Sequence, residues 1–336
     1  MQRSCVQESD DAPAKPTGVF QAAASEVRDQ FPMWFTVWLP IGHVFTAMWL
    51  VQPARPSALA TVLLPLSWAA VFLAVRRRRG KGPPAGVLAL LCATAPLIAL
   101  LWWLPAWLMY DVADPTRLKF GFEVLSLAWV VALIWHCFHT RGWRGVAVFF
   151  GVGAVYGLCL ENGGITLGFF SEPDYRLYVP FTRTPLSSVA GWCTIFYPSA
   201  FIAESLLARW VAVRRSILAS AALLAAIALS SDLHFDPIAT ALRMWVWHPT
   251  LPAAYLGVPL VNYTSWFTSV SAFAGTLFVA QRRGWTARSL PMFAVFAIPA
   301  MLLMAGAGNL LLIGALEGFS GPSWTLLLAA VRAALP

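Results

Sequence analysis

Hydrophobic and polar positions in this chain form long blocks. Apolar runs cover about 33–51, 58–75, 86–108, 122–138, 145–160, 186–207, 216–231, 257–280, 290–315 and 322–335. Most of these runs approach the ~20 apolar residues that a helix needs to cross a ~30 Å hydrocarbon core. They are continuous, whereas the strands of a transmembrane β-barrel alternate apolar and polar residues. The pattern predicts an all-α, polytopic transmembrane helix bundle with about 9–10 spans, because the last run is short.

The polar connections between the runs differ in charge. Basic residues cluster after the second, fourth, sixth and eighth runs, and the other connections hold most of the acids. Basic loops favour the cytoplasmic side of a membrane. We therefore expect an integral protein of a bacterial-type cytoplasmic membrane, with a cytoplasmic N-terminus and extracytoplasmic acidic loops. Residues 1–30 are polar and predict a disordered cytoplasmic tail, followed by a single transmembrane helical domain over 31–336.

Composition narrows the function classes. The chain has 336 residues, is 59% hydrophobic and has a net charge of +8. The basic residues lie in short clusters at helix ends, so the charge does not indicate a nucleic-acid partner. Five cysteines have no CxxC spacing, which argues against a disulfide framework or a zinc site. Five histidines are too few for the repeated histidine boxes of a membrane di-iron oxygenase. With no P-loop or dinucleotide motif either, the sequence predicts neither a cofactor nor a metal.

A weak internal repeat links two parts of the chain. The segment PLSSVAGW, which ends at Trp192, matches PLVNYTSW, which ends at Trp266. An acid precedes each segment by a similar interval, Glu161 in the first case and Asp236 in the second. This pattern predicts a parallel repeat over about 145–215 and 216–288, with the two acids at equivalent places around a pseudo-axis. Chance similarity is the alternative interpretation.

Five acids fall at membrane depth, where ionisable residues are functional candidates by default. They are Glu123, Glu161, Glu204, Asp232 and Asp236. The i, i+4 spacing of Asp232 and Asp236 puts both on one helix face. The proline after Asp236 predicts that this helix ends there. Neighbouring carboxyls in an apolar setting retain a proton and can act as a general acid. The alternative is that these acids cap helices, sit in wet loops or form interhelical hydrogen bonds.

Aromatic residues gather in the same region, mostly within residues 231–267. The candidates are Trp192, Trp245, Trp247, Tyr255, Tyr263 and Trp266. Tryptophan and tyrosine commonly form belts at membrane interfaces. The functional alternative is that their ring faces stabilise a carbocation by cation–π attraction.

Two segments carry a family resemblance. They are ENGGITLGFF…YRLYVPFTRTPLSSVAGW (161–192) and DLHFDPIATALRMWVWHPTLPAAYLGVPLVNYTSWF (232–267). The second combines an acid, a DP pair, a W-x-W pair, GVPL-x-N and a tryptophan. Both resemble the integral-membrane carotenoid biosynthesis proteins that include the carotenoid 1',2'-hydratases and the bisanhydrobacterioruberin hydratase.

The resemblance implies hydration of the terminal double bond of an acyclic carotenoid, without a cofactor. The partners would be an apolar carotenoid or isoprenoid from the bilayer and a water molecule. Asp236 or Asp232 would be the acid, and Glu161 would hold or deprotonate the water. The remaining roles are water positioning, lining of the cation site and control of the acids' ionisation. Asn262, Tyr255 and Tyr263 would position the water. Trp245, Trp247 and Trp266 would line the cation site, and Trp192 would also contact the substrate. Arg243 would control the ionisation of the acids.

Two other functions stay open. Asp232 and Asp236 form a DxxxD pattern, which suggests an intramembrane prenyltransferase that binds diphosphate through magnesium. The chain could instead be a non-enzymatic lipid or carotenoid carrier, or a transporter with inward-facing acids.

Overall fold

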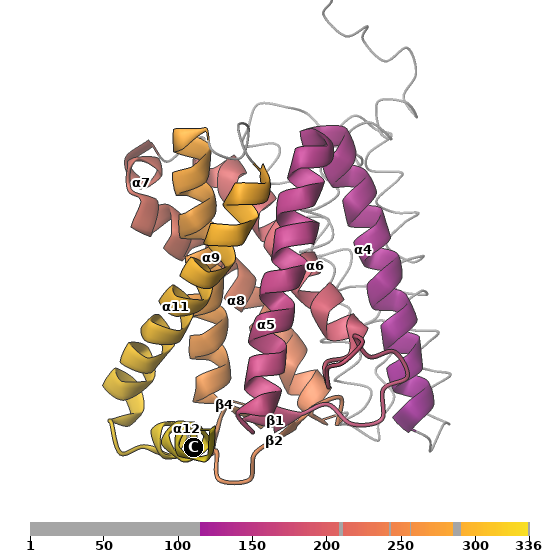
Figure 1. Ribbon diagram of the computed structural model, residues 1–336, viewed down its shortest axis with the longest axis vertical. Helices are drawn as coiled ribbons and strands as arrows, with labels where there is room; N and C mark the ends of the chain where they lie inside the picture. The colour runs from indigo at the N-terminus through magenta and orange to yellow at the C-terminus, as the bar shows by residue number, and fades with distance from the viewer. Residues whose placement is uncertain (1–114, 208–210, 242, 256, 285–289, 335–336) are drawn as a thin grey trace, which may run out of the picture.

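The computed structural model describes residues 115–207, 211–241, 243–255, 257–284 and 290–334. The first three apolar runs and the expected N-terminal tail lie outside these ranges. The described chain is a helix bundle (Figure 1). Its helical elements are α4 (Pro115–Val146), η1 (Ala147–Val152), α5 (Gly153–Thr166), α6 (Leu186–Leu207), α7 (Val211–Arg215), α8 (Ile217–Ala241), α9 (Leu260–Arg283), α11 (Leu290–Glu317) and α12 (Pro322–Ala334).

Short strands occupy one end of the bundle, which we call the loop end because the connections 167–185 and 243–259 lie there (Figure 1). They are β1 (Phe170–Ser171), β2 (Val246–Trp247), β3 (Ala253–Tyr255) and β4 (Val258–Pro259). β1 pairs antiparallel with β2, and β3 with β4. The β1–β2 pair therefore ties the two long connections to each other.

The apolar runs correspond well to the described helices. Within the described residues, three stretches are long and apolar enough to cross a membrane: Ser126–Thr166, Leu186–Glu204 and Leu290–Glu317. The first contains a sharp turn at Gly142, whose φ of 66° favours glycine. This turn separates the fourth and fifth predicted runs and lets α4 and α5 run in opposite directions (Figure 1).

The last predicted run forms α12, which has 13 residues. That length is below the roughly 20 residues needed for a span, and α12 lies across the loop end of the bundle (Figure 1).

The prediction that a helix ends at Asp236 is wrong. α8 continues through Pro237 to Ala241. A proline inside a helix removes one backbone hydrogen bond, and packing offsets the loss in this last turn. Ala239 is 1% exposed and forms a small apolar cluster with Tyr175 and Met244.

Charge separates the two ends of the bundle. Arg144, Arg214, Arg215 and Arg282 lie near the α4–α5 turn, in α7 and at the end of α9, and this basic end is opposite the loop end (Figure 1). In the described part, these arginines lie at the end of the bundle opposite the acids Glu161 and Asp236. Which end faces the cytoplasm stays a prediction.

Matched positions of the sequence repeat contact each other. The Trp192 and Trp266 rings stack with centroids 3.9 Å apart and an interplanar angle of 23°. Phe170 lies opposite Trp247 in the β1–β2 pair. Each of these two residues follows the acid and precedes the PL…W segment of its own half. α5 packs on α6, and α8 packs on α9. These contacts fit two units around an approximate pseudo-axis, and the repeat itself stays a prediction.

Candidate active site

A cavity of about 330 Å³ opens at the loop end of the bundle. Its walls come from α5, α9, α11 and α12 and from the residues around β1 and β2. Most of the lining is apolar or aromatic. Two acids lie in it, Glu161 from α5 and Asp236 from α8. The structure thus brings two acids that are distant in sequence to one cavity.

Glu161 is held by a tryptophan of the neighbouring helix. Trp192 Nε1 on α6 donates a hydrogen bond to Glu161 Oε2 at 2.8 Å. This approach requires a glycine on α5, because a Cβ at Gly157 would lie 2.6 Å from Trp192. The Trp192 bond engages one carboxyl oxygen of Glu161. The other oxygen has no protein donor among the described residues.

Asp236 is 2% exposed and shares a donor with Asp232. Asn262 Nδ2 on α9 donates to Asp236 Oδ2 and also to Asp232 Oδ2, the latter at 3.3 Å. The Trp266 indole is also in hydrogen-bonding contact with the Asp236 carboxyl. Glu161 and Asp236 are therefore each bound by the tryptophan of the matching PL…W segment.

Asp232 lies behind Asp236 and is fully buried. It does not line the cavity, but its carboxyl contacts that of Asp236. Asp232 Oδ1 is buried and accepts no hydrogen bond from a donor among the described residues. A proton held between the two carboxyls would provide the missing bond.

Aromatic and amide side chains complete the walls. Trp245 and Trp247 line the cavity along with Trp192, Asn262 and Trp266. Trp247 is oriented by a hydrogen bond from Nε1 to Thr240 Oγ1 at 2.9 Å. No lysine, arginine or histidine is among the described lining residues. The cavity is therefore an aromatic, apolar space with two acids and no lining cation in the described part.

Three of the predicted substrate-binding residues lie outside the cavity lining. Tyr255 is 45% exposed. Tyr263 is buried, and its hydroxyl donates to the Tyr255 carbonyl at 3.5 Å. Arg243 is exposed, with a φ of 54°. The structure therefore separates these three residues from the surfaces that face the cavity.

Sequence reasoning missed Glu172, in the connection that follows α5. This side chain is 4% exposed, and its Oε1 accepts a hydrogen bond from Ser188 Oγ at 2.7 Å. Burial raises the pKa of Glu172 well above its ordinary value, and the nearby Glu161 carboxylate raises it further. Acids in polar connections are ordinarily solvated, so the sequence carried no signal for this burial.

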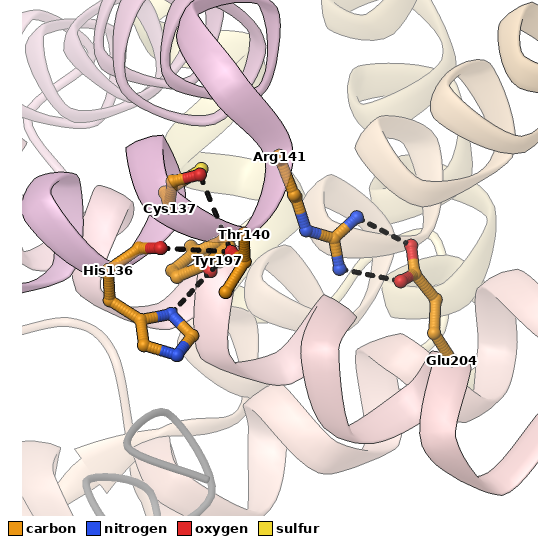
Figure 2. A network of polar contacts seen from close by, with 6 residues as sticks. All are labelled: His136, Cys137, Thr140, Arg141, Tyr197 and Glu204. Carbon is orange, nitrogen blue, oxygen red and sulfur yellow. Dashed lines mark hydrogen bonds and ion pairs between the residues drawn. The ribbon is translucent and has the colours of Figure 1, made fainter. Parts of the chain in front are cut away.

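The two remaining membrane-depth acids have structural partners. The Glu123 carboxylate accepts backbone N–H groups of Arg176 and Leu177 and so anchors the connection after β1. At the basic end, Arg141 binds Glu204 through two parallel hydrogen bonds of 3.1 and 2.5 Å (Figure 2). Both match the alternative that these acids only make structural hydrogen bonds.

A family model of carotenoid biosynthesis proteins matches residues 121–330. The chain belongs to the carotenoid biosynthesis protein family. The matched range covers both acid–tryptophan pairs and the described cavity lining, which confirms the family resemblance seen in the sequence. Comparison with curated proteins and with solved structures gave no match. Family membership and the three apolar stretches together indicate a membrane protein of carotenoid biosynthesis.

Proposed function

We propose that this carotenoid biosynthesis protein hydrates the terminal double bond of an acyclic carotenoid. The observation that carries the proposal is that two acids, Glu161 and Asp236, line an aromatic cavity with no lining cation in the described part. Adding water to an isolated alkene requires a strong acid, protection of the resulting cation and a positioned water molecule. Each requirement has a counterpart among the residues around the cavity.

Asp236 is the general acid, and its carboxyl contacts that of the more deeply buried Asp232. Two carboxyls buried in contact cannot both ionise cheaply, so the pair retains a proton. Asn262 donates to one oxygen of each carboxyl and thus accommodates a shared negative charge. Asp236 faces the cavity and Asp232 does not. Asp236 is therefore placed to deliver the proton.

Proton transfer to the less substituted carbon of the double bond leaves a tertiary cation. Trp245, Trp247 and Trp266 line the space where it would form, and we propose that their ring faces stabilise it. Tryptophan is the side chain whose ring face attracts cations most strongly, by roughly 2 kcal/mol or more when desolvated. No lysine or arginine in the described lining competes with the substrate for these faces.

Glu161 completes the reaction as the base. Its Oε2 is engaged by Trp192, and the other oxygen can accept a hydrogen bond from water. The water oxygen bonds to the cation, Glu161 takes the released proton, and a tertiary alcohol results. The proton then returns to Asp236, so the reaction consumes one alkene and one water and needs no redox partner.

The size of the cavity fits one end of the substrate. About 330 Å³ is at the lower limit of the ~300–1,000 Å³ of pockets that bury drug-sized ligands. A full-length carotenoid is larger than such a ligand. The cavity would therefore hold the reacting end, with the rest of the polyene outside it.

The alternatives receive less support. A prenyltransferase must hold a diphosphate, yet the described cavity lining has no basic side chain and Asp232 is not part of it. A carrier needs an apolar cavity but has no need of two acids that each bind a tryptophan.

The test is expression of the full chain in a host that accumulates lycopene or a related acyclic carotenoid. The expected product is heavier by one water. Asp236→Asn should abolish it, whereas Asp174→Asn should not, because Asp174 is a loop-end acid whose side chain is 68% exposed. Unchanged pigments across several acyclic carotenoids, with the protein present in the membrane, would refute the proposal.

A further inference from the structure

The connection between α5 and α6 buries a carboxyl that the reaction described above does not use. Glu172 is 4% exposed and does not line the cavity. Ser188 satisfies its Oε1, but its Oε2 is buried with no hydrogen-bond partner among the described residues. Burying a carboxyl oxygen without a hydrogen-bond partner is costly, because the oxygen loses its hydration and gains nothing in exchange. Such atoms are normally satisfied by an internal water molecule.

Three more hydroxyls in the same region share this property. The side-chain oxygens of Tyr175, Thr184 and Ser187 are buried and have no hydrogen-bond partner among the described residues. Burial raises the pKa of the Tyr175 hydroxyl, and the nearby charges of Glu172 and Glu161 raise it further. Glu172 and these three hydroxyls lie within residues 172–187, and the hydrogen bond between Ser188 and Glu172 holds the two ends of this segment together. A buried water molecule requires two to four polar partners of this kind.

Anchoring the connection does not explain Glu172. Glu123 already does this, through backbone N–H groups of Arg176 and Leu177. The buried Lys119 does not neutralise Glu172 by a direct ion pair. Its Nζ donates to the Pro173 carbonyl at 2.6 Å and lies 3.6 Å from Asp174 Oδ2.

Burial and the negative charge of Glu161 raise the pKa of Glu172 and so favour its neutral form. Burial contributes most to its raised pKa, followed by the negative charge of Glu161; Asp236 adds to the effect and Lys119 opposes it. A neutral acid can both donate and accept hydrogen bonds, as each member of a water chain must. It also avoids placing a second charge next to an ionised Glu161.

We propose that residues 172–188 enclose a hydrated passage from the loop end to Glu161, which supplies the water that adds to the carotenoid. Glu172 is a positioning residue in it: with Ser188 it orders the water molecules toward Glu161. The water and the apolar substrate would then reach the cavity by separate routes. The role in supply rests on the proposed hydration, whereas the presence of water in the passage does not.

Hydroxyl-radical footprinting of the detergent-solubilised wild-type protein tests for water directly. Radicals generated from internal water by X-rays oxidise side chains that touch it. Tyr175 is 7% exposed and should be oxidised much faster than Tyr156. Tyr156 is a matched control, fully buried with its hydroxyl donating to the Ser269 carbonyl at 3.1 Å. Equally slow oxidation of the two tyrosines would show a dry connection and overturn the proposal.

Two variants test the supply of water. Glu172→Met removes the polar group at similar volume and should lower the hydration rate by at least about tenfold, because Glu161 loses the water on which it acts. Carotenoid binding should not change. Glu172→Gln, which keeps neutral hydrogen bonding, should restore most of the rate. A wild-type rate for Glu172→Met, or equal losses in the two variants, would overturn the role in supply.

The outcomes separate this inference from the proposed function. If Tyr175 is oxidised rapidly but the wild-type protein hydrates no carotenoid, the proposed function fails while the hydrated passage stands. If the wild-type protein is an active hydratase but Tyr175 stays unmodified, only the passage is refuted.

Discussion

The two ends of the bundle differ in whether an acid has a cationic partner. At the basic end, Arg141 and Glu204 form a bidentate ion pair between α4 and α6 (Figure 2). Beside it, His136 Nδ1 and the Tyr197 hydroxyl are 2.7 Å apart, and Thr140 Oγ1 donates to the His136 carbonyl. At the loop end, Glu161 and Asp236 face a cavity with no cation in its described lining.

This difference indicates what each cluster does. A paired charge satisfies its partner and leaves nothing available for a ligand, so the Arg141–Glu204 pair connects helices. A group of buried carboxyls without a cation retains at least one proton, so one member can donate a proton while another remains able to accept one. We therefore assign the basic-end cluster to structure and Glu161 and Asp236 to chemistry. The predictions below test this assignment.

After the abolished activity expected for Asp236→Asn, the largest effect comes from Glu161→Gln. Loss of the base should lower the hydration rate by about 10²-fold or more. The amide oxygen can still accept the Trp192 hydrogen bond, so we expect little change in unfolding temperature. Product formation and thermal unfolding should be measured on the same preparation. A variant that loses stability and activity together would place Glu161 among the structural acids.

Asp232→Asn should have a smaller effect than Asp236→Asn, about tenfold on the hydration rate. Asp232 acts through its contact with Asp236 and does not reach the cavity. Rates of the two variants with the same carotenoid give the comparison. A greater loss for Asp232→Asn would exchange the roles of the two carboxyls.

Glu204→Gln should lower stability and leave activity unchanged. Removing the Glu204 carboxylate leaves the Arg141 guanidinium without a counter-charge. The Glu204 side chain is 33% exposed and that of Arg141 is 20% exposed. We expect the free energy of unfolding to fall by about 1–2 kcal/mol, between the values for exposed and fully buried pairs. Activity per folded molecule should not change. A selective loss of hydration without loss of stability would contradict the structural assignment.

Glu172→Gln should produce the smallest effect, a change in how stability depends on pH. The folded-state pKa of Glu172 is raised above its unfolded value. Its contribution is therefore fully present below about pH 4.3, the ordinary pKa of glutamate. It is lost as the pH rises toward the folded-state pKa.

Glutamine does not titrate, so the stability of the wild-type protein relative to Glu172→Gln should fall as the pH rises from about 4.3. Unfolding in detergent over a pH series measures this difference. A difference that stays constant across the series would mean that the pKa of Glu172 is the same in the folded and unfolded states.

The helices were predictable because local patterns specify them. The run 186–207 coincides with α6, and the turn between the fourth and fifth runs occurs at Gly142, where a positive φ favours glycine. The extension of α8 past Asp236 was not predictable. The proline at 237 argues for a helix end, and the packing of Ala239 against Tyr175 and Met244 overrides it.

The candidate site was predictable in part. Glu161, Asp236 and four tryptophans stood out because acids and aromatic residues are conspicuous in an apolar chain, and all of them line the cavity. Tyr255 and Arg243 stood out for the same reason but are exposed. Composition cannot show which way a side chain in a loop points.

By itself, the sequence determined that this protein is helical, that its basic and acidic connections alternate, and which family it resembles. Only the tertiary structure decided which acids are compensated. Glu204 forms an ion pair with Arg141, and Glu123 accepts the backbone N–H of Arg176. Glu161 and Asp236 instead have tryptophan partners and interact electrostatically with each other. These contacts join residues on different helices or connections, so they depend on how the helices pack and leave no trace in the local sequence pattern.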